Sequence, residues 1–154
     1  MSPVKQTALR QFELDDLLPV ADIERMVFGS GGYQLLSIRQ LYDLFPSLVW
    51  VAVDTDGKVV GHAFGAIEQG GKIGWILNFA VIAHYRRTGT GTRLLEQLIS
   101  ELGAAGAEAV RATAETHNGD AYRLYQKLGF SEVGTVVNYY GDGTDRLIFE
   151  RRTD

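Results

Sequence analysis

The chain has 154 residues, of which 45% are hydrophobic and 22% are charged, and its formal net charge is −4. These values are typical of one soluble globular domain over residues 1–154, and they argue against nucleic-acid binding through a basic surface. Cysteine is absent, which excludes disulfides, thiolate metal sites and a cysteine nucleophile. No segment has the apolar length of a signal peptide or a membrane span, so we expect a cytoplasmic protein without a membrane partner.

A strand and two helices are expected first. Residues 6–12 fit a strand, and apolar residues then recur at helical spacing over residues 14–28, with Asp15 as the expected N-cap. A glycine-rich segment ends this helix. A second helix over residues 36–44 stops before Pro46, because the residue before a proline disfavours helical geometry.

Three strands follow, at residues 48–53, 59–68 and 74–81. The apolar period changes to two, and the segments D-T-D-G-K and Q-G-G-K between the runs are typical turns. Residues 74–81 are apolar on both faces, which predicts a central strand that is covered on both sides.

The remaining segments alternate between helices and strands. A long helix after the next glycine turn has one apolar face, formed by Leu94, Leu95, Leu98, Ile99 and Leu102. A strand at 109–114 and a short helix at 120–128 come next, with Gly129 as a left-handed C-cap. Strands at 133–140 and 146–151 flank a Gly-Asp-Gly hairpin signal.

This order of elements predicts the fold class. The sequence β-α-α-β-β-β-α-β-α-β-β indicates an α/β protein with about seven strands. We expect a mixed, mostly antiparallel central sheet with helices on both faces.

The strongest local motif follows a buried strand and opens a helix: Arg86-Arg87-Thr88-Gly89-Thr90-Gly91. The first N–H groups of a helix lack partners and carry the positive end of the helix dipole, so they form an anion site. The two glycines let a phosphate approach the main chain, and the two arginines add charge. The spacing differs from that of a P-loop or a dinucleotide fold. The alternative is a plain strand–helix turn that needs glycine for its geometry.

A second motif, N-G-D-A-Y-R-L-Y-Q-K-L-G-F over residues 118–130, looks by itself like a capped amphipathic helix. Together, the two segments resemble the GNAT superfamily of N-acetyltransferases. Residues 86–91 match its R/Q-x-x-G-x-G/A signature, and residues 118–130 match N-x-x-A-x-x-L-Y-x-K-x-G-F. The spacing of the motifs and the order of the elements also match over most of the chain. Ala83 and Arg87 depart from the pattern, because many members carry proline and glycine there.

The resemblance implies acetyl-CoA as the acetyl donor, with no metal. It also implies a sheet that splays between its fourth and fifth strands. The pantetheine arm is expected in that gap, along the backbone of Phe79, Ala80 and Val81, with the diphosphate on the main chain of residues 87–92. The expected cofactor contacts are completed by Arg86, Arg87, Thr88, Gly89, Thr90, Gly91, Thr92, Asn118, Ala121 and Tyr125.

The family's chemistry implies that an amine attacks the acetyl group directly, without an acyl-enzyme. A strand N–H at Val81 would stabilise the oxyanion, and Tyr125 would be the general acid that protonates the thiolate. Outside the motif, Tyr125 would look like an ordinary core tyrosine.

The general base is less defined. Some family members carry a glutamate where this chain has Leu77. Glu115 is our candidate for the catalytic base, and His117 and Glu68 are alternatives. A water relay through Asn78 would need no dedicated base.

The acceptor cleft of this fold is usually built by the two N-terminal helices, their loop and the last hairpin. Here the candidate acceptor contacts are Glu24, Tyr33, Glu68, Asn78 and Tyr139, with Tyr140 beside them. The acceptor is an amine of a small molecule or a peptide. Small amines, amino acids, aminoglycoside-like compounds, protein lysines and protein N-termini all stay open.

Other functions compete with this one. The chain could be a non-catalytic acyl-CoA sensor, or it could transfer a longer acyl chain. Acetylation of charged tRNA is disfavoured by the acidic balance. A homodimer through the apolar segment 133–140, as a sheet edge, is a further expectation.

Overall fold

The computed structural model describes residues 5–154 and contains one seven-stranded sheet of order β1-β2-β3-β4-β5-β7-β6. The helices are α1 (Leu17–Phe28), α2 (Leu35–Leu44), α3 (Thr90–Ala104) and α4 (Gly119–Lys127). The strands are β1 (Ala8–Gln11), β2 (Val49–Val53), β3 (Val59–Ile67), β4 (Ile73–Val81), β5 (Ala109–Glu115), β6 (Ser131–Val136) and β7 (Arg146–Arg152). The predicted α/β class and order of elements are confirmed.

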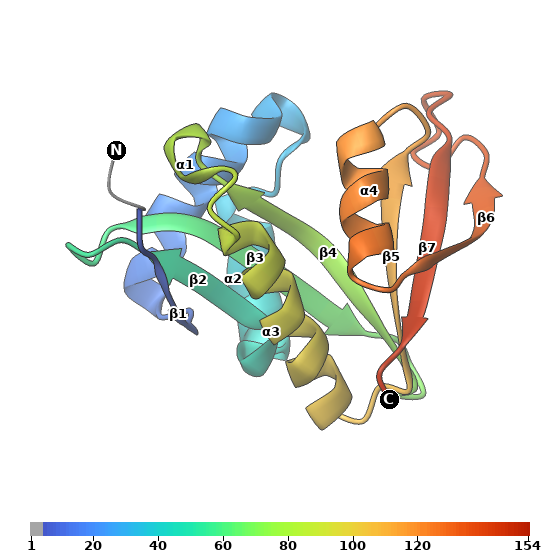
Figure 1. Cartoon of the computed structure of the whole chain (residues 1–154), viewed down its shortest axis with the longest axis horizontal. Coiled ribbons are helices and arrows are strands. Elements are labelled where there is room, and N and C mark those ends of the chain that lie inside the picture. Colours follow the sequence, from blue (N-terminus) through green and yellow to red (C-terminus); the bar gives the residue numbers. More distant parts are fainter. Residues whose placement is uncertain (1–4) are drawn as a thin grey trace.

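The fourth and fifth strands part from one another. β4 and β5 are the parallel pair of the sheet, and their pairing runs only from Ile73 opposite Ala109 to Trp75 opposite Arg111. Both strands continue well beyond that point, β4 to Val81 and β5 to Glu115. In Figure 1 they diverge from a shared end, which divides the sheet into two wings. The predicted splay is confirmed.

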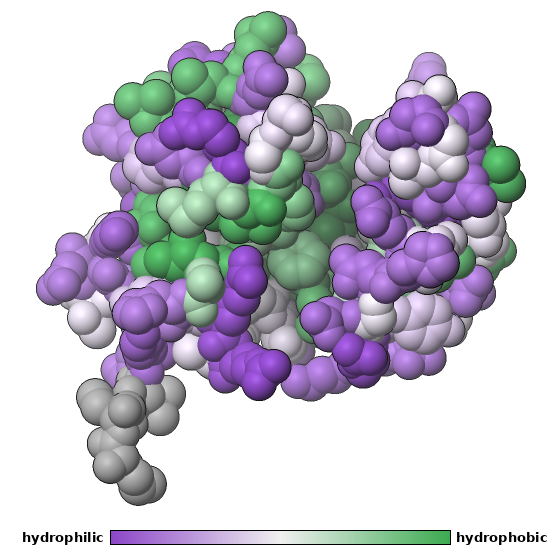
Figure 2. Space-filling model, turned by 90° about the horizontal axis from the view of Figure 1, so that it is seen from above, coloured by the Kyte–Doolittle hydropathy of each residue, from purple (hydrophilic) through white to green (hydrophobic). Residues whose placement is uncertain are grey.

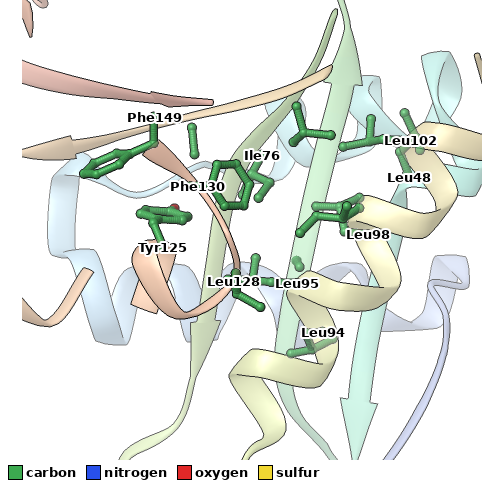
Figure 3. Close-up of a cluster of buried hydrophobic side chains, with 14 of the residues drawn as sticks. Leu48, Ile76, Leu94, Leu95, Leu98, Leu102, Tyr125, Leu128, Phe130 and Phe149 are labelled. Carbon is green, nitrogen blue, oxygen red and sulfur yellow. The ribbon is translucent and has the colours of Figure 1, made fainter. Parts of the chain in front are cut away.

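The helices cover both faces of the sheet, as predicted. α1 and α2 pack on one face around Val20, Ile23 and Ile38, which are buried together with residues of β2 and β3. α3 and α4 pack on the other face. The apolar stripe of α3 lies against the strands as its helical spacing predicts, and Figure 3 shows Leu94, Leu95, Leu98 and Leu102 along it.

The end of α4 has the predicted left-handed cap. Gly129 has a φ of 86°, and the Phe130 N–H donates to the Tyr125 carbonyl over 2.9 Å. The Phe130 ring then folds back to 5.3 Å from the Tyr125 ring. This reversal buries the side chain of Tyr125 between α4 and β7 (Figure 3).

The start of α1 differs from the prediction. Asp15 is exposed, and a short 3-10 turn (Leu14–Asp16) precedes the helix. Asp16 is the buried acid, and it accepts the Glu13 N–H over 2.8 Å. The expectation of Asp15 as the cap was wrong because the guanidinium of Arg10 on β1 holds Asp16 with two hydrogen bonds of 2.7 and 2.8 Å.

β4 is not covered on both sides, contrary to the prediction. Ile76 and Ala80 are buried, but Trp75, Leu77, Asn78, Phe79 and Val81 are only half-buried. The sequence pattern misled because most of these side chains are apolar although they line an opening. Beyond Trp75, β5 has parted from β4, so only β3 pairs with this part of the strand.

The last hairpin is shorter than predicted. β6 ends at Val136, and the long connection to β7 contains Tyr139 and Tyr140. Asn138 organises this loop, since its side-chain oxygen accepts the Gly143 N–H over 2.6 Å. β7 lies between β5 and β6, so the predicted sheet edge is confirmed at β6. The homodimer through this edge stays a prediction. No helix within residues 5–154 has both the length and the apolar character needed to cross a membrane.

Candidate active site

A cavity of about 460 Å³ lies beside the end of β4, between the turn into α3 and α4. Figure 2 shows a notch between the two halves of the molecule, with apolar residues at its floor. The end of β4 forms one wall and the turn into α3 forms another. Of the residues predicted to contact the cofactor, the structure brings these to the cavity: Phe79, Ala80, Val81, Arg86, Arg87, Gly89, Gly91 and Thr92. Lys127 of α4, which the sequence analysis missed, adds a third cation.

The turn into α3 leaves main-chain donors free. Gly89 is the N-cap, with left-handed φ and ψ of 82° and 0°. The first hydrogen bond of the helix runs from the Arg93 N–H to the Gly89 carbonyl over 3.0 Å. The N–H groups at 90–92 therefore have no partner within the helix, and they carry the positive end of its dipole. This arrangement fits a diphosphate.

Two positions in the turn show why it can take a phosphate. A Cβ added at Gly91 would lie 3.7 Å from Val81 Cγ2, without a clash, and it would point into the cavity lining. Arg87 has a φ of 61°, a conformation that costs a non-glycine residue about 1 kcal/mol. The departure from glycine at Arg87 thus strains the backbone but adds a positive charge at the mouth of the cavity.

Other predicted cofactor residues are engaged within the protein. The Thr88 hydroxyl donates to the Tyr85 carbonyl over 2.6 Å and pairs with the buried Thr90 hydroxyl at 2.7 Å. The Asn118 side chain caps α4 by accepting the Ala121 N–H over 3.1 Å. The cavity is not lined by Thr88, Thr90, Asn118 or Ala121. The two threonines can therefore meet a ligand only through the main chain.

The Val81 N–H faces the opening. The next residue, Ile82, donates its N–H to the Val60 carbonyl of β3 over 2.9 Å. Successive N–H groups of an extended chain point to opposite sides, so that of Val81 points away from β3. The Val81 carbonyl faces the same way and accepts Arg86 Nε over 3.2 Å.

Tyr125 lies in the core beside the opening, and its residue as a whole is only 4% exposed. Its ring contacts Phe130 and Phe149 at centroid distances of 5.3 and 5.2 Å. Burial raises the pKa of Tyr125 well above its usual value, and the positive charge of Arg146 opposes this only in part. The phenol therefore stays protonated at neutral pH. Its side chain does not line the cavity described above, nor the larger cavity described next.

A larger cavity of about 840 Å³ adjoins the first. Residues 75–78 of β4 line it, and residues 79–81 line the smaller one, so the two meet along this strand. The remaining walls are the α1–α2 connection, the end of β5 and the β6–β7 loop. Four predicted site residues come together here: Tyr33, Asn78, Glu115 and Tyr139.

Glu24 does not face this cavity. It is fully buried, and its carboxylate lies 2.7 Å from His62 Nε2 and accepts both Asn78 Nδ2, at 2.9 Å, and the Tyr33 N–H, at 3.0 Å. Glu24 therefore positions cavity residues instead of meeting an amine. His62 was missed as a partner. The signal in the sequence was the position of Glu24 four residues after Val20, on the apolar face of α1.

The candidate bases separate in the structure. Glu115 lies at the rim of the larger cavity and is exposed. Glu68 is exposed at the outer end of β3, where it accepts Trp75 Nε1 over 2.7 Å, and it lines neither cavity. His117 is exposed and also lies outside both cavities. Over residues 5–154 no group of three or more His, Cys, Asp or Glu side chains could hold a metal ion.

Arg146 is a residue of the larger cavity that the sequence analysis also missed. It begins β7 and lines the larger cavity. Its Nε donates to Thr113 Oγ1 over 2.8 Å, and its Nη2 donates to the Thr113 carbonyl over 3.0 Å. The only signal was a cation at the start of the last strand.

The chain was compared with known proteins. The model of the acetyltransferase (GNAT) family matches residues 17–130. An N-alpha-acetyltransferase of Sulfurisphaera tokodaii is 31% identical, over 94% of this chain and 92% of the relative. The structure of Ard1 from Thermoplasma volcanium superposes with a TM-score of 0.86 at 28% identity, over 95% of this chain and 97% of that one. Naa20 of Chaetomium thermophilum, solved with a bisubstrate analogue, gives 0.82 at 27% identity, over 94% of this chain and 86% of that one.

Motifs, parted strands and relatives agree, which sets aside the interpretation as a non-catalytic sensor. The chain belongs to the acetyltransferase (GNAT) family and transfers an acetyl group from acetyl-CoA to an amine.

Proposed function

We propose that the acceptor is the α-amine at the N-terminus of a peptide or protein. The observation that carries this proposal is the lining of the larger cavity, where none of the described residues is a buried carboxylate or histidine that could act as a base. Two relatives that are named N-alpha-acetyltransferases, at 31% and 27% identity over 94% and 93% of this chain, support it.

The acidity of the amine gives the physical argument. An α-amine has a pKa near ~7.8, so roughly one molecule in seven is neutral at pH 7, whereas a lysine with a pKa near ~10.4 is neutral in roughly one molecule in 2,500. Leu77 occupies the position on β4 where some family members carry a glutamate, and Glu115 is exposed at the rim of the cavity. A site of this kind favours an amine that needs little help to lose its proton.

The shape of the larger cavity also suits a chain terminus. It runs from the α1–α2 connection at Tyr33 to the β6–β7 loop at Tyr139 and Tyr140. Aromatic walls on both sides can hold the backbone of the first residues, and the volume of about 840 Å³ accommodates their side chains. The α-amine would then sit next to Asn78, where the two cavities meet.

The proposed roles follow from these positions. Asn78 donates its amide to Glu24, which leaves its carbonyl oxygen to hold the amine or a water that carries off the proton. The amine attacks the thioester carbonyl, and the Val81 N–H stabilises the oxyanion, a contribution of about 3 kcal/mol for one such donor. Tyr125, held protonated by burial, donates its proton to the departing thiolate. Glu115 at the rim accepts the proton from water.

A peptide with both kinds of amine tests the proposal. It should carry a free N-terminus and one internal lysine, and mass spectrometry should locate the acetyl group after partial turnover. We expect the label on the α-amine, in excess by on the order of 100-fold or more at pH 7, because of the difference in neutral fraction.

The control peptide has a blocked N-terminus and the same lysine. Acetylation of the lysine in both peptides at similar rates would contradict the α-amine proposal. Turnover of free amino acids or polyamines alone, with neither peptide modified, would assign the cavity to a small molecule.

A further inference from the structure

We propose that Arg146 forms an anion subsite in the larger cavity, which selects acceptors with a carboxylate side chain on the first or second residue. This inference rests on the α-amine proposal, because it presupposes a peptide N-terminus in the cavity. It assigns a specificity-determining role to a residue outside both family motifs.

The guanidinium of Arg146 is fixed in place. Arg146 pairs across the sheet with Glu115, yet its side chain turns along β5 to Thr113. The hydrogen bonds of 2.8 and 3.0 Å to Thr113 leave from Nε and Nη2. The Tyr140 ring lies against the same group, with its centroid 5.6 Å from Cζ. Within residues 5–154 no hydrogen bond uses Nη1, so one donor edge is available to a ligand.

The charge of Arg146 has no ion-pair partner among the described residues. Among the described residues, six arginines have a carboxylate within 4.0 Å, whereas Arg146 has none, like the arginines at 86, 87, 93 and 151. The carboxylates of Glu115 and Asp142 line the same cavity, but both are exposed. A peptide that fills the cavity displaces water from a half-buried cation. That cost is recovered only when the acceptor brings an anion.

The Arg146 charge also acts on the groups around the acceptor. Burial raises the pKa of Tyr33 and of Tyr125, and the positive charge of Arg146 opposes the rise at both. The same charge disfavours the ammonium form of a nearby amine, which helps the acceptor to lose its proton. A carboxylate one residue away compensates the cation, since guanidinium and carboxylate match in charge and in fork geometry.

Matched peptides test this inference. Two pairs should differ only by Glu against Gln, one pair at the first residue and one at the second. We expect the wild type to prefer the acid in at least one pair, with a ratio of kcat/KM on the order of 10-fold, as for one charge-assisted pair of hydrogen bonds. In Arg146→Gln that ratio should fall to near one, and Arg146→Lys should retain part of it. Arg152→Gln, on the same strand with an exposed side chain, is the control and should keep the wild-type ratio.

A binding measurement separates the two proposals. The N-acetylated forms of the same peptides should be titrated into the CoA-bound enzyme, because the products bind without any turnover. Tighter binding of the acids without turnover of any free peptide would retain the subsite and overturn the α-amine acceptor. Turnover with equal rates for the acid and the amide in both pairs would retain the α-amine acceptor and overturn the subsite. Equal binding combined with no turnover would overturn both.

Discussion

Gly91 is the residue at which the acetyl-CoA site can be changed without harm to the fold. It lies inside the first turn of α3, with space for a Cβ that faces the cavity. Gly91→Ala should stabilise the protein by about 0.5–1 kcal/mol, since glycine is unfavourable within a helix. The added methyl should obstruct the diphosphate and weaken acetyl-CoA binding on the order of 10-fold or more. Thermal unfolding and calorimetric titration measure the two effects. An unchanged affinity for acetyl-CoA would show that the diphosphate binds elsewhere.

Tyr125→Phe should remove the proton donor and keep the core. Phenylalanine retains the ring contacts with Phe130 and Phe149, so the melting temperature and the acetyl-CoA affinity should stay close to those of the wild type. We expect kcat to fall on the order of 100-fold. Because burial raises the pKa of Tyr125, the wild-type rate should not decline with ionisation of this phenol below about pH 10. A mutant with wild-type kcat would leave Tyr125 a purely structural residue.

Glu24→Gln tests whether the buried carboxylate positions the acceptor cavity. The substitution should cost on the order of 2 kcal/mol, because charge-assisted hydrogen bonds to Asn78 and the Tyr33 N–H are weakened. We expect the KM for the peptide to rise while the affinity for acetyl-CoA, bound on the other side of Asn78, stays constant. Equal loss of both affinities would indicate general destabilisation instead.

Sequence reasoning reached the main-chain parts of the site better than its side chains. The anion turn could be predicted because glycines and a helix start specify it locally. The contacts of Glu24 with His62 and Asn78 and that of Arg146 with Thr113 could not, since each joins residues that are 33 or more positions apart. Such contacts depend on strand register, which the pattern of apolar residues leaves open.

At the scale of elements, the junction of β1 and α1 depends on one acid. Burial alone would raise the pKa of Asp16, but hydrogen bonds from Arg10 and the Glu13 N–H, together with the Arg10 charge, outweigh it and lower the pKa. A group with a lowered pKa stabilises the fold above its unfolded pKa near ~3.9, and the contribution is lost as the pH falls through the folded value.

Asp16→Asn should therefore reduce the free energy of unfolding at pH 7 by about 1.5–3 kcal/mol, and it should flatten the loss of stability below about pH 4. Urea unfolding between pH 3 and 7 measures both effects. Asp43→Asn, in the exposed i, i+4 pair with Arg39, is the matched control and should cost less than about 0.5 kcal/mol. An equal cost for both variants would show that the Arg10 pair contributes little.

The elements themselves were predictable to within a few residues, and their surroundings were not. β4 looked like a fully covered strand because its residues are apolar, although an opening lies beside it. The apolar segment at 137–140 looked like a continuation of β6, but it forms part of the acceptor wall. In both places apolar side chains line a cavity instead of being fully buried in the core.

At the scale of the whole molecule, both cavities lie along β4, from which β5 parts beyond Trp75, and the end of β5 lines the larger one. The smaller cavity meets the larger one at consecutive residues of β4, so the proposed sites of donor and acceptor lie on either side of Asn78. The family resemblance implied the parting. Spacing alone gave only the order of strands, since nothing in the local sequence shows where two paired strands separate.

A crystal structure with a bisubstrate compound, in which CoA is joined through an acetyl group to the α-nitrogen of a short peptide, tests this account most directly. The account predicts the diphosphate on the main chain of residues 87–92, the pantetheine between β4 and β5, and the first peptide residues between Tyr33 and Tyr139. A peptide part that lies outside the larger cavity, or a diphosphate away from the start of α3, would contradict it.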